Sequence, residues 1–200
     1  MIRSVVAVVC CLLANVGFAQ TIGPSNFPPS EVMVYGNGRA DHAMPPWSIT
    51  APKPDGWTAD CCGYAKNLHV NLVMYAGQWT GKPERVMILT TWPANAQLLD
   101  DVLKSDQEDY LKKNPAGKVV PFPIANKGGL TCRGQMYAGL EGKLDDFVVF
   151  CQPQDKSSGL QLSWSMQLAG DDPSRQQILA WFKQVVEGSS YAPYVPVQGQ

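Results

Sequence analysis

The pattern of apolar and polar positions is most regular between Val119 and Leu168, where it predicts four strands joined by short turns. Residues 160–168 alternate apolar and polar side chains at every step, which is typical of a strand with one buried face. Residues 146–151 carry apolar side chains on both faces, so this strand is predicted to be buried on both sides. The first strand, 119–124, contains two prolines that cannot donate ladder hydrogen bonds, which places it at the edge of the sheet.

Shorter apolar runs before this meander predict further elements. Strands are expected at 47–50, 68–75 and 86–92, where apolar residues either alternate or run continuously. Over 96–113 the apolar residues recur at helical spacing instead, and Asn95 is the expected N-cap of this helix.

A last helix is predicted to cover the meander. Asp172 is its expected cap, Pro173 stands in the first turn, where proline is preferred, and Gly188 ends it. Its apolar stripe is expected to pack on the apolar side of the last strand, which is formed by Leu160, Leu162, Trp164 and Met166. These elements predict an α+β fold: a mostly antiparallel sheet of about six strands with two main helices packed on it.

The N-terminal residues carry the signals of export. Arg3 precedes a short apolar segment, and small residues up to Ala19 predict cleavage between Ala19 and Gln20. The apolar segment is shorter than a membrane span, so we expect a periplasmic or secreted protein with no span in the mature chain. The predicted organisation is a signal peptide at 1–19, an extended Pro- and Gly-rich arm at 20–45 with one strand-like run at 31–35, a single domain at 46–188 and a flexible tail at 189–200.

Four cysteines remain after cleavage, and an even number in an exported protein favours disulfides. Folding the hairpin about Glu141 brings Cys132 almost opposite Cys151, so we predict a disulfide between them after a one-residue adjustment or a bulge. Cys61 and Cys62 then form a vicinal disulfide or stay reduced. Four cysteines allow three complete pairings. In the competing arrangement, one of these two cysteines forms its disulfide with a cysteine of the meander.

Several functions find no support in the sequence. The 16 basic and 17 acidic residues give a formal net charge of −1, without the basic patch that nucleic-acid binding requires. No Gly-x-Ser-x-Gly motif is present, and only His42 and His69 offer imidazole bases. His42 lies in the arm, and His69 is predicted in mid-strand, where a structural role is favoured. Cys61, Cys62 and His69 match no standard zinc spacing. We therefore predict no catalytic residue, no metal site and no cofactor.

A partner surface is the remaining hypothesis about a site. Two tryptophans, Trp57 and Trp79, lie in predicted turns, where core packing is favoured over exposure to a ligand or partner. The polar side of the last strand is uncharged and regularly spaced. It is either an ordinary solvent face or a flat hydrogen-bonding surface for a protein partner, and its members are Gln161, Ser163, Ser165 and Gln167.

A resemblance to a known family adds to this interpretation. The turn Pro54–Trp57, the strands 70–75 and 85–92, the Gly-containing meander and a last helix running into Ser190–Tyr191 resemble small exported bacterial proteins with a PsbP-like fold. The resemblance covers about residues 46 to 191. It implies an antiparallel sheet sandwiched by helices and a non-catalytic binding, adaptor or assembly role, and it assigns no functional residue.

The expected function is therefore that of an exported, non-catalytic protein that acts through contacts with another protein. The most informative experiment is to capture that partner from a periplasmic extract. One alternative is a periplasmic immunity protein that neutralises a secreted toxin. A second alternative is a cell-envelope hydrolase, which requires a cleft joining His69 to a carboxylate or a thiol.

Overall fold

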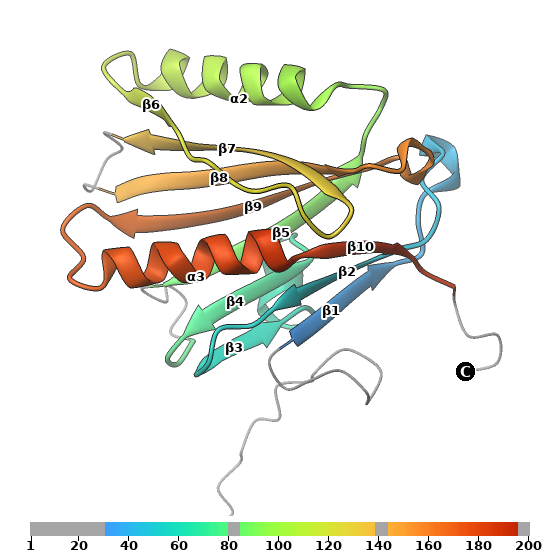
Figure 1. The fold of residues 1–200 in the computed structure, drawn as a ribbon, viewed down its shortest axis with the longest axis horizontal. Helices are drawn as coiled ribbons and strands as arrows, with labels where there is room; N and C mark the ends of the chain where they lie inside the picture. The colour runs from blue at the N-terminus through green and yellow to red at the C-terminus, as the bar shows by residue number, and fades with distance from the viewer. Residues whose placement is uncertain (1–30, 80–84, 139–143, 196–200) are drawn as a thin grey trace, which may run out of the picture.

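A computed structural model describes residues 31–79, 85–138 and 144–195, and the predicted signal peptide and its cleavage site lie outside these residues. A seven-stranded antiparallel sheet carries the fold, with the strand order β3-β4-β5-β9-β8-β7-β6 (Figure 1). Its strands are β3 (Trp57–Asp60), β4 (Leu72–Ala76), β5 (Val86–Pro93), β6 (Lys118–Pro121), β7 (Leu130–Ala138), β8 (Leu144–Pro153) and β9 (Leu160–Ala169).

The predicted meander is present as β6 to β9, in which each strand pairs with the next. β6 lies at the edge of the sheet, as predicted, and it ends at Pro121, so that Pro123 lies beyond the strand. β9 does not end the sheet, because β5 pairs along its other side from Met87 opposite Met166 to Pro93 opposite Leu160. The strand with the clearest alternation therefore lies in the middle of the sheet.

A second sheet of three strands has the order β1-β2-β10, formed by β1 (Glu31–Gly36), β2 (Trp47–Pro52) and β10 (Ser190–Pro193). The strand-like run in the predicted arm is β1, and its Val32 and Val34 are buried in the core. Residues 190–193 of the tail expected to be loose form β10 instead, which pairs with β2 directly after the last helix, and residues 196–200 of that tail lie outside the described residues. Both ends of the described chain are thus held by β2, since a strand with two free edges offers hydrogen bonds on each side.

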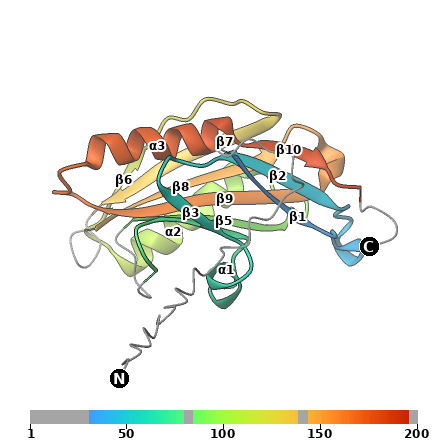
Figure 2. The ribbon, with the colours of Figure 1, turned by 90° about the horizontal axis from the view of Figure 1, so that it is seen from below.

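Three α-helices are described: α1 (Tyr64–Asn67), α2 (Leu99–Lys113) and α3 (Arg175–Gly188), with 3-10 turns at Ala40–His42 and Lys156–Ser158. Figure 2 shows α3 and the small sheet on one face of the large sheet, with α1 and α2 on the other. The core lies under α3, where Ile178, Phe182 and Val185 join Leu162 and Trp164 in one buried cluster, all at most 1% exposed. The α+β class is confirmed, whereas the expected single sheet of about six strands is two sheets with ten strands among the described residues.

Both long helices begin later than predicted. Asn95 and Ala96 have positive φ angles of 47° and 60°, so α2 starts only at Leu99 and Asn95 is not its cap. Asp172 does not cap α3, because its carboxylate accepts a hydrogen bond from the Ser174 backbone N–H at 2.7 Å in the turn before Arg175. Asn95 and Asp172 are both residue types that cap helices, but each lies in a tight turn that precedes its helix.

The predicted strand 68–75 is shorter and starts later. Leu68 and His69 follow α1 in a turn in which His69 has a φ of 57°, and β4 begins at Leu72. The prediction that His69 lies in mid-strand is therefore wrong. The turn replaces the first half of the strand because the Val70 N–H donates to Ala65 and the Asn71 N–H donates to Leu89, which fixes the chain to α1 and β5.

Candidate functional site

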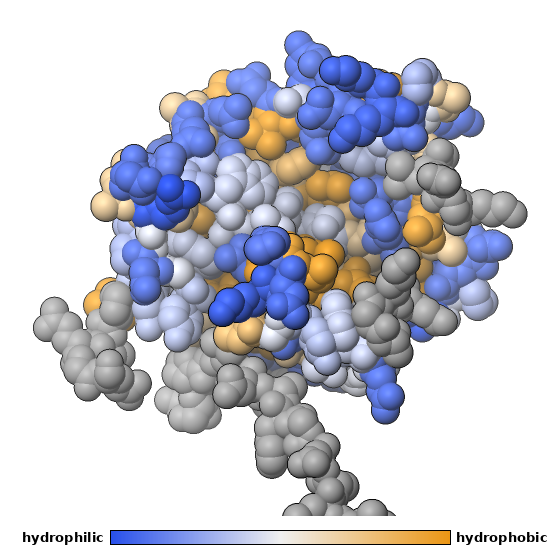
Figure 3. All heavy atoms as spheres, turned by 180° about the vertical axis from the view of Figure 1, so that it is seen from behind, coloured by the Kyte–Doolittle hydropathy of each residue, from blue (hydrophilic) through white to orange (hydrophobic). Residues whose placement is uncertain are grey.

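The face of the large sheet opposite α3 is only partly covered by helices. α1 lies over β4 and α2 lies over β7 and β8, so that β5 and β9 run between them (Figure 2). The half-buried side chains of this gap are called the open strip below: Ile88, Thr90 and Trp92 of β5, Val148 of β8, and Ser163 and Ser165 of β9. Figure 3 looks onto this face, where apolar side chains show at the centre between hydrophilic groups.

The register of the three strands explains the chemistry of the open strip. Ser165 stands between Ile88 and Val148, and Ser163 stands between Thr90 and the buried Phe150. Directly paired residues place their side chains on the same face of a sheet. The strip therefore combines apolar and hydroxyl side chains, and none of its six residues carries a charge at neutral pH.

One end of the open strip is closed by a hydrogen-bonded relay around Gln161. The Trp92 indole N–H donates to Gln161 Oε1 at 3.1 Å, and Gln161 Nε2 donates to the Gln97 carbonyl at 3.0 Å. Gln161 is 0% exposed and so does not belong to an exposed partner surface, in contrast to its prediction. Its role is to hold the loop before α2 against the sheet and to orient the Trp92 ring.

The two tryptophans predicted in turns have different positions. Trp57 begins β3, is 5% exposed and meets Trp181 of α3 edge to face, with ring centroids 6.2 Å apart. It belongs to the core and is unavailable to a partner. Trp79 is half-buried and stacks on Tyr64 of α1 at 4.2 Å, with Tyr75 of β4 edge-on at 5.2 Å. This aromatic group fastens α1 to β4 and forms one rim of the open strip.

The opposite rim is a polar cluster between α2 and the sheet. Tyr137 of β7 donates its hydroxyl to the Asp106 carboxylate of α2, and Gln135 Nε2 donates to the same carboxylate at 3.2 Å. Burial raises the pKa of the Asp106 carboxyl, with the hydrogen bond from Tyr137 opposing the change. Burial, together with the hydrogen bond to Asp106, also raises the pKa of the Tyr137 phenol, so it stays neutral.

Asp146 of β8 adds a second carboxyl to this cluster. It is paired with Tyr137 on one side and with the exposed Gln167 of β9 on the other. Burial, and then the neighbouring charge of Asp106, raise the pKa of Asp146 to about 6, while a hydrogen bond with Gln167 works against this. One carboxyl on α2 and one on the sheet thus both have raised pKa values, which makes the contact between α2 and the sheet sensitive to pH.

The histidines lie apart from the open strip. His42 is exposed, and its Nδ1 is 3.2 Å from Asn95 Oδ1 in a hollow of about 480 Å³ lined by residues 94–98, 152–153 and 156–160. His69 is also exposed and lines a different hollow of about 690 Å³, together with Cys61, Cys62 and Lys66. Within the described residues, no three His, Cys, Asp or Glu side chains are placed to share a metal ion.

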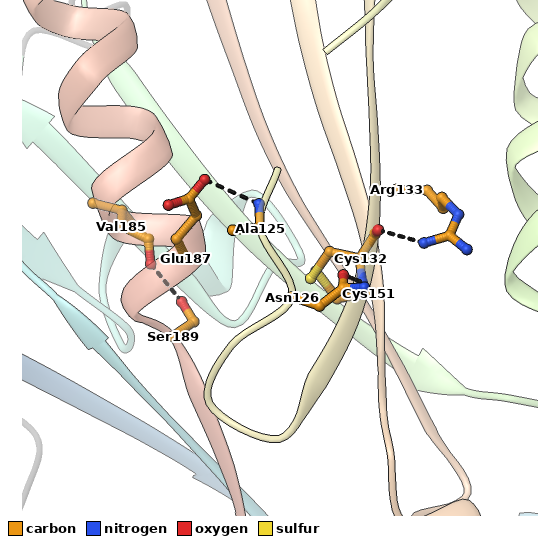
Figure 4. Close-up of a disulfide and its surroundings, with 8 residues drawn as sticks. All are labelled: Ala125, Asn126, Cys132, Arg133, Cys151, Val185, Glu187 and Ser189. Atoms are coloured by element: carbon orange, nitrogen blue, oxygen red, sulfur yellow. Dashed lines mark hydrogen bonds between the residues drawn. A yellow bond between two sulfur atoms is a disulfide. The ribbon is translucent and has the colours of Figure 1, made fainter. Parts of the chain in front are cut away.

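The cysteines form two disulfides of different character. Cys132 and Cys151 are bonded and stand directly opposite each other in β7 and β8, so the prediction is confirmed and no bulge is needed. Figure 4 shows this disulfide beside Asn126, whose Oδ1 accepts the Cys132 N–H at 2.8 Å. Cys61 and Cys62 are bonded to each other, which is one of the alternatives that the sequence left open.

Several contacts place a connecting loop between α3 and the buried disulfide. The carboxylate of Glu187 accepts the Ala125 N–H at 3.0 Å, and Ser189 Oγ donates to the Val185 carbonyl at 2.7 Å (Figure 4). The loop between β6 and β7 is thereby tied to the end of α3. These contacts give the region a structural role, since they join the loop, the end of α3 and the strand of the disulfide.

Among the residues described, no helix is both long enough and apolar enough to cross a membrane.

The chain matches no protein-family model, and no curated protein sequence matches it. The resemblance to PsbP-like proteins therefore stays a prediction. Among solved structures the chain is similar to LpqN, which is described as involved in cell envelope biogenesis of Mycobacterium tuberculosis. The TM-score is 0.52 at 15% identity, and the likeness covers 82% of this chain and 92% of LpqN. The likeness shows that this chain and LpqN share a fold across most of their length.

Proposed function

We propose that this protein is an exported, non-catalytic binding protein of the cell envelope that acts by contacting another protein through the open strip. The carrying observation is the stretch of β5, β9 and β8 between α1 and α2 that no helix covers within the described part of the chain. Its six uncharged side chains combine apolar, aromatic and hydroxyl groups. The cores of protein–protein interfaces have this composition, because they are poor in charged residues and rich in aromatic ones.

The rigidity of the strip supports the same proposal. β5 and β9 lie in the middle of a seven-stranded sheet, and the Trp92 ring is oriented by its hydrogen bond to Gln161. A surface that is already ordered loses little conformational entropy when a partner binds. We therefore assign Trp92 as the residue with the largest contribution to the affinity, since tryptophan is enriched among such residues.

The proposed absence of catalysis follows from the chemistry of the strip. Ser163 and Ser165 have no histidine among the strip residues to act as their base, and the exposed His69 lies in the hollow of the Cys61–Cys62 disulfide instead. A serine hydroxyl becomes a nucleophile beside a base such as histidine or lysine, and neither is among the six strip residues. The envelope location rests on the two disulfides, which persist in oxidising compartments, and on the fold shared with LpqN.

A pair of substitutions tests the proposal. Ser163→Arg and Ser165→Arg put a long charged side chain on the strip, whereas Gln184→Arg puts the same side chain on an exposed position of α3, on the other face. Tagged mature protein is used to recover partners from a periplasmic extract, with folding of each variant checked by circular dichroism. We expect the strip variants to lose the partner that the wild type and Gln184→Arg retain. Equal recovery by all four proteins would exclude the open strip as the contact surface.

Affinity measurement then tests the assigned residue. Trp92→Phe removes the hydrogen bond to Gln161, and Trp92→Ala removes the ring as well. For a dominant contact residue we expect Trp92→Ala to weaken binding of the recovered partner by about 2 kcal/mol, or about 30-fold. A change below threefold would contradict the role of Trp92 while leaving the strip itself to be judged by the arginine variants.

A further inference from the structure

The two disulfides differ sharply in their access to solvent. Cys132 and Cys151 are 4% and 0% exposed and lie between paired strands in the core. Cys62 is exposed and Cys61 is half-buried, and both line the hollow of about 690 Å³ that also contains Lys66 and His69. Thiol–disulfide exchange needs a nucleophile to reach a sulfur atom, so access separates structural disulfides from reactive ones.

We propose that the Cys61–Cys62 pair is a thiol–disulfide exchange site that accepts two electrons from a dithiol of another exported protein. A thiolate of the dithiol attacks Sγ of the exposed Cys62, forms a mixed disulfide and breaks the bond to Cys61, which leaves as a thiolate with the bonding electron pair. The second thiolate of the dithiol then attacks the first sulfur of the same dithiol, which is bonded to Cys62 in the mixed disulfide. This step releases Cys62 as a thiolate. The dithiol ends as a disulfide, Cys61 and Cys62 end as two thiols, and the two protons lost by one pair are taken up by the other.

The charges of the hollow favour this exchange. The leaving group is a thiolate, and a cationic side chain beside it lowers the free energy of the charged sulfur. Lys66 supplies an ammonium group to the hollow, and His69 supplies an imidazole that can give a proton to the released sulfur. The carboxylate of Asp60 lies close by, but it is engaged by the backbone N–H groups of Gly63 and Ala65, at 3.1 and 2.9 Å.

The chain around the pair is held by contacts that do not need the disulfide. The hydrogen bonds to Asp60 fix the turn that follows Cys62, and Ala65 of α1 is 0% exposed. Tyr64 stacks on Trp79, and the Val70 N–H donates to the Ala65 carbonyl. Opening the bond between Cys61 and Cys62 therefore leaves α1 in place. A disulfide that can open without unfolding its surroundings is able to pass through repeated cycles.

Differential reduction of the folded protein tests the proposal. The purified oxidised protein is treated with dithiothreitol or reduced glutathione, quenched with an alkylating reagent and mapped by mass spectrometry. We expect Cys61 and Cys62 to be alkylated at least tenfold faster than Cys132 and Cys151, and the thermal melting temperature to stay within 2 °C of the oxidised protein after the first reduction, a margin of about 1 kcal/mol or less. Similar rates for the two pairs, or reduction of Cys61–Cys62 only in urea, would overturn it.

Substitutions then test whether the side chains of the hollow assist the exchange, or whether exposure of the disulfide alone explains its rate of reduction. Lys66→Gln and His69→Gln keep the size of each side chain but remove its charge or its proton, and we expect each to slow the reduction of Cys61–Cys62 by threefold or more. Lys183→Gln is the matched control, because Lys183 lies on α3 against the Phe122 ring, and it is expected to change nothing. In the Cys61→Ser variant, Cys62 is expected to form a stable mixed disulfide with oxidised glutathione. Failure of Cys62 to do so in the folded variant, or unchanged rates in both hollow variants, would refute the proposed site.

Discussion

The carboxyl of Asp146 offers a direct test of the polar cluster beneath α2. It lies in β8 opposite Tyr137 and Gln167, with the Asp106 carboxyl of α2 as a neighbouring charge. Asp146→Asn keeps the shape of the side chain and its ability to hydrogen-bond with Gln167, but it removes the ionisation. We expect this substitution to stabilise the protein at neutral pH, which is unusual for a half-buried polar residue.

The magnitude follows from the pKa of Asp146, which is about 6 in the folded protein against an ordinary value of 3.8. Each unit of difference corresponds to about 1.4 kcal/mol, so the ionised carboxyl costs the folded state about 3 kcal/mol. The folded state holds the proton more tightly than the unfolded chain, so stability falls as pH rises between about 4 and 6. The cost is fully present above pH 7 and absent below about pH 4. The gain from Asp146→Asn should follow the same course.

Urea unfolding followed by tryptophan fluorescence measures this dependence. With a typical slope of about 2 kcal/mol per molar urea, a gain of about 3 kcal/mol moves the midpoint by about 1.5 M. We expect such an increase at pH 7.5 and almost none at pH 4. Asp171→Asn, at an exposed position in the turn before α3, is the control and should change neither midpoint. A loss of stability at pH 7.5, or an equal gain at both pH values, would show that ionisation of Asp146 is not what destabilises the folded state.

Four further predictions concern the core, the disulfide, export and catalysis. Phe182→Ala, at a site that is 0% exposed, should cost about 3–5 kcal/mol in urea unfolding, and a loss below about 1 kcal/mol would contradict the packing of α3. Replacing Cys132 and Cys151 by serine opens a loop closed across 19 residues and should cost about 3 kcal/mol, whereas a melt unchanged by the double substitution would show that the bond adds nothing. The exported protein should begin at Gln20 by N-terminal sequencing, and a chain that still starts at Met1 would argue against export. No hydrolytic activity on cell-envelope material should depend on His69. If His69→Ala abolished such an activity while the thermal stability stayed unchanged, the binding-protein hypothesis would be refuted.

Local sequence patterns predicted the elements that are stabilised by their nearest neighbours in the chain. The meander β6 to β9 follows from alternation and turn residues, and the edge position of β6 follows from prolines that cannot join a ladder on both sides. The Cys132–Cys151 bond follows from the geometry of one hairpin. In each case the deciding contacts join strands that are consecutive in sequence, so the spacing of residues contains the information.

Residues whose role depends on a distant segment were assigned less well. Gln161 stands in the polar series of β9, yet it is buried because the loop before α2 folds over it. Core packing is the favoured interpretation of Trp57 from the sequence and is confirmed, yet its neighbour Trp181, from a distant part of the chain, could not be identified in this way. Polarity and turn propensity describe a residue and its neighbours, and they contain no information on which remote element will cover it.

The sequence by itself determined the α+β class, the meander and the two long helices, because periodicity records which face of each element avoids water. It favoured the Cys132–Cys151 disulfide but left a competing pairing open. Only the tertiary structure decided that β5 pairs with β9, that β1 and β10 join β2 in a second sheet, and that α1 and α2 leave the open strip between them. It also decided that the Cys61–Cys62 pair shares a hollow with Lys66 and His69. The physical reason is that pairing and coverage are chosen by the packing of the whole core, in which segments far apart in sequence compete for the same apolar surface.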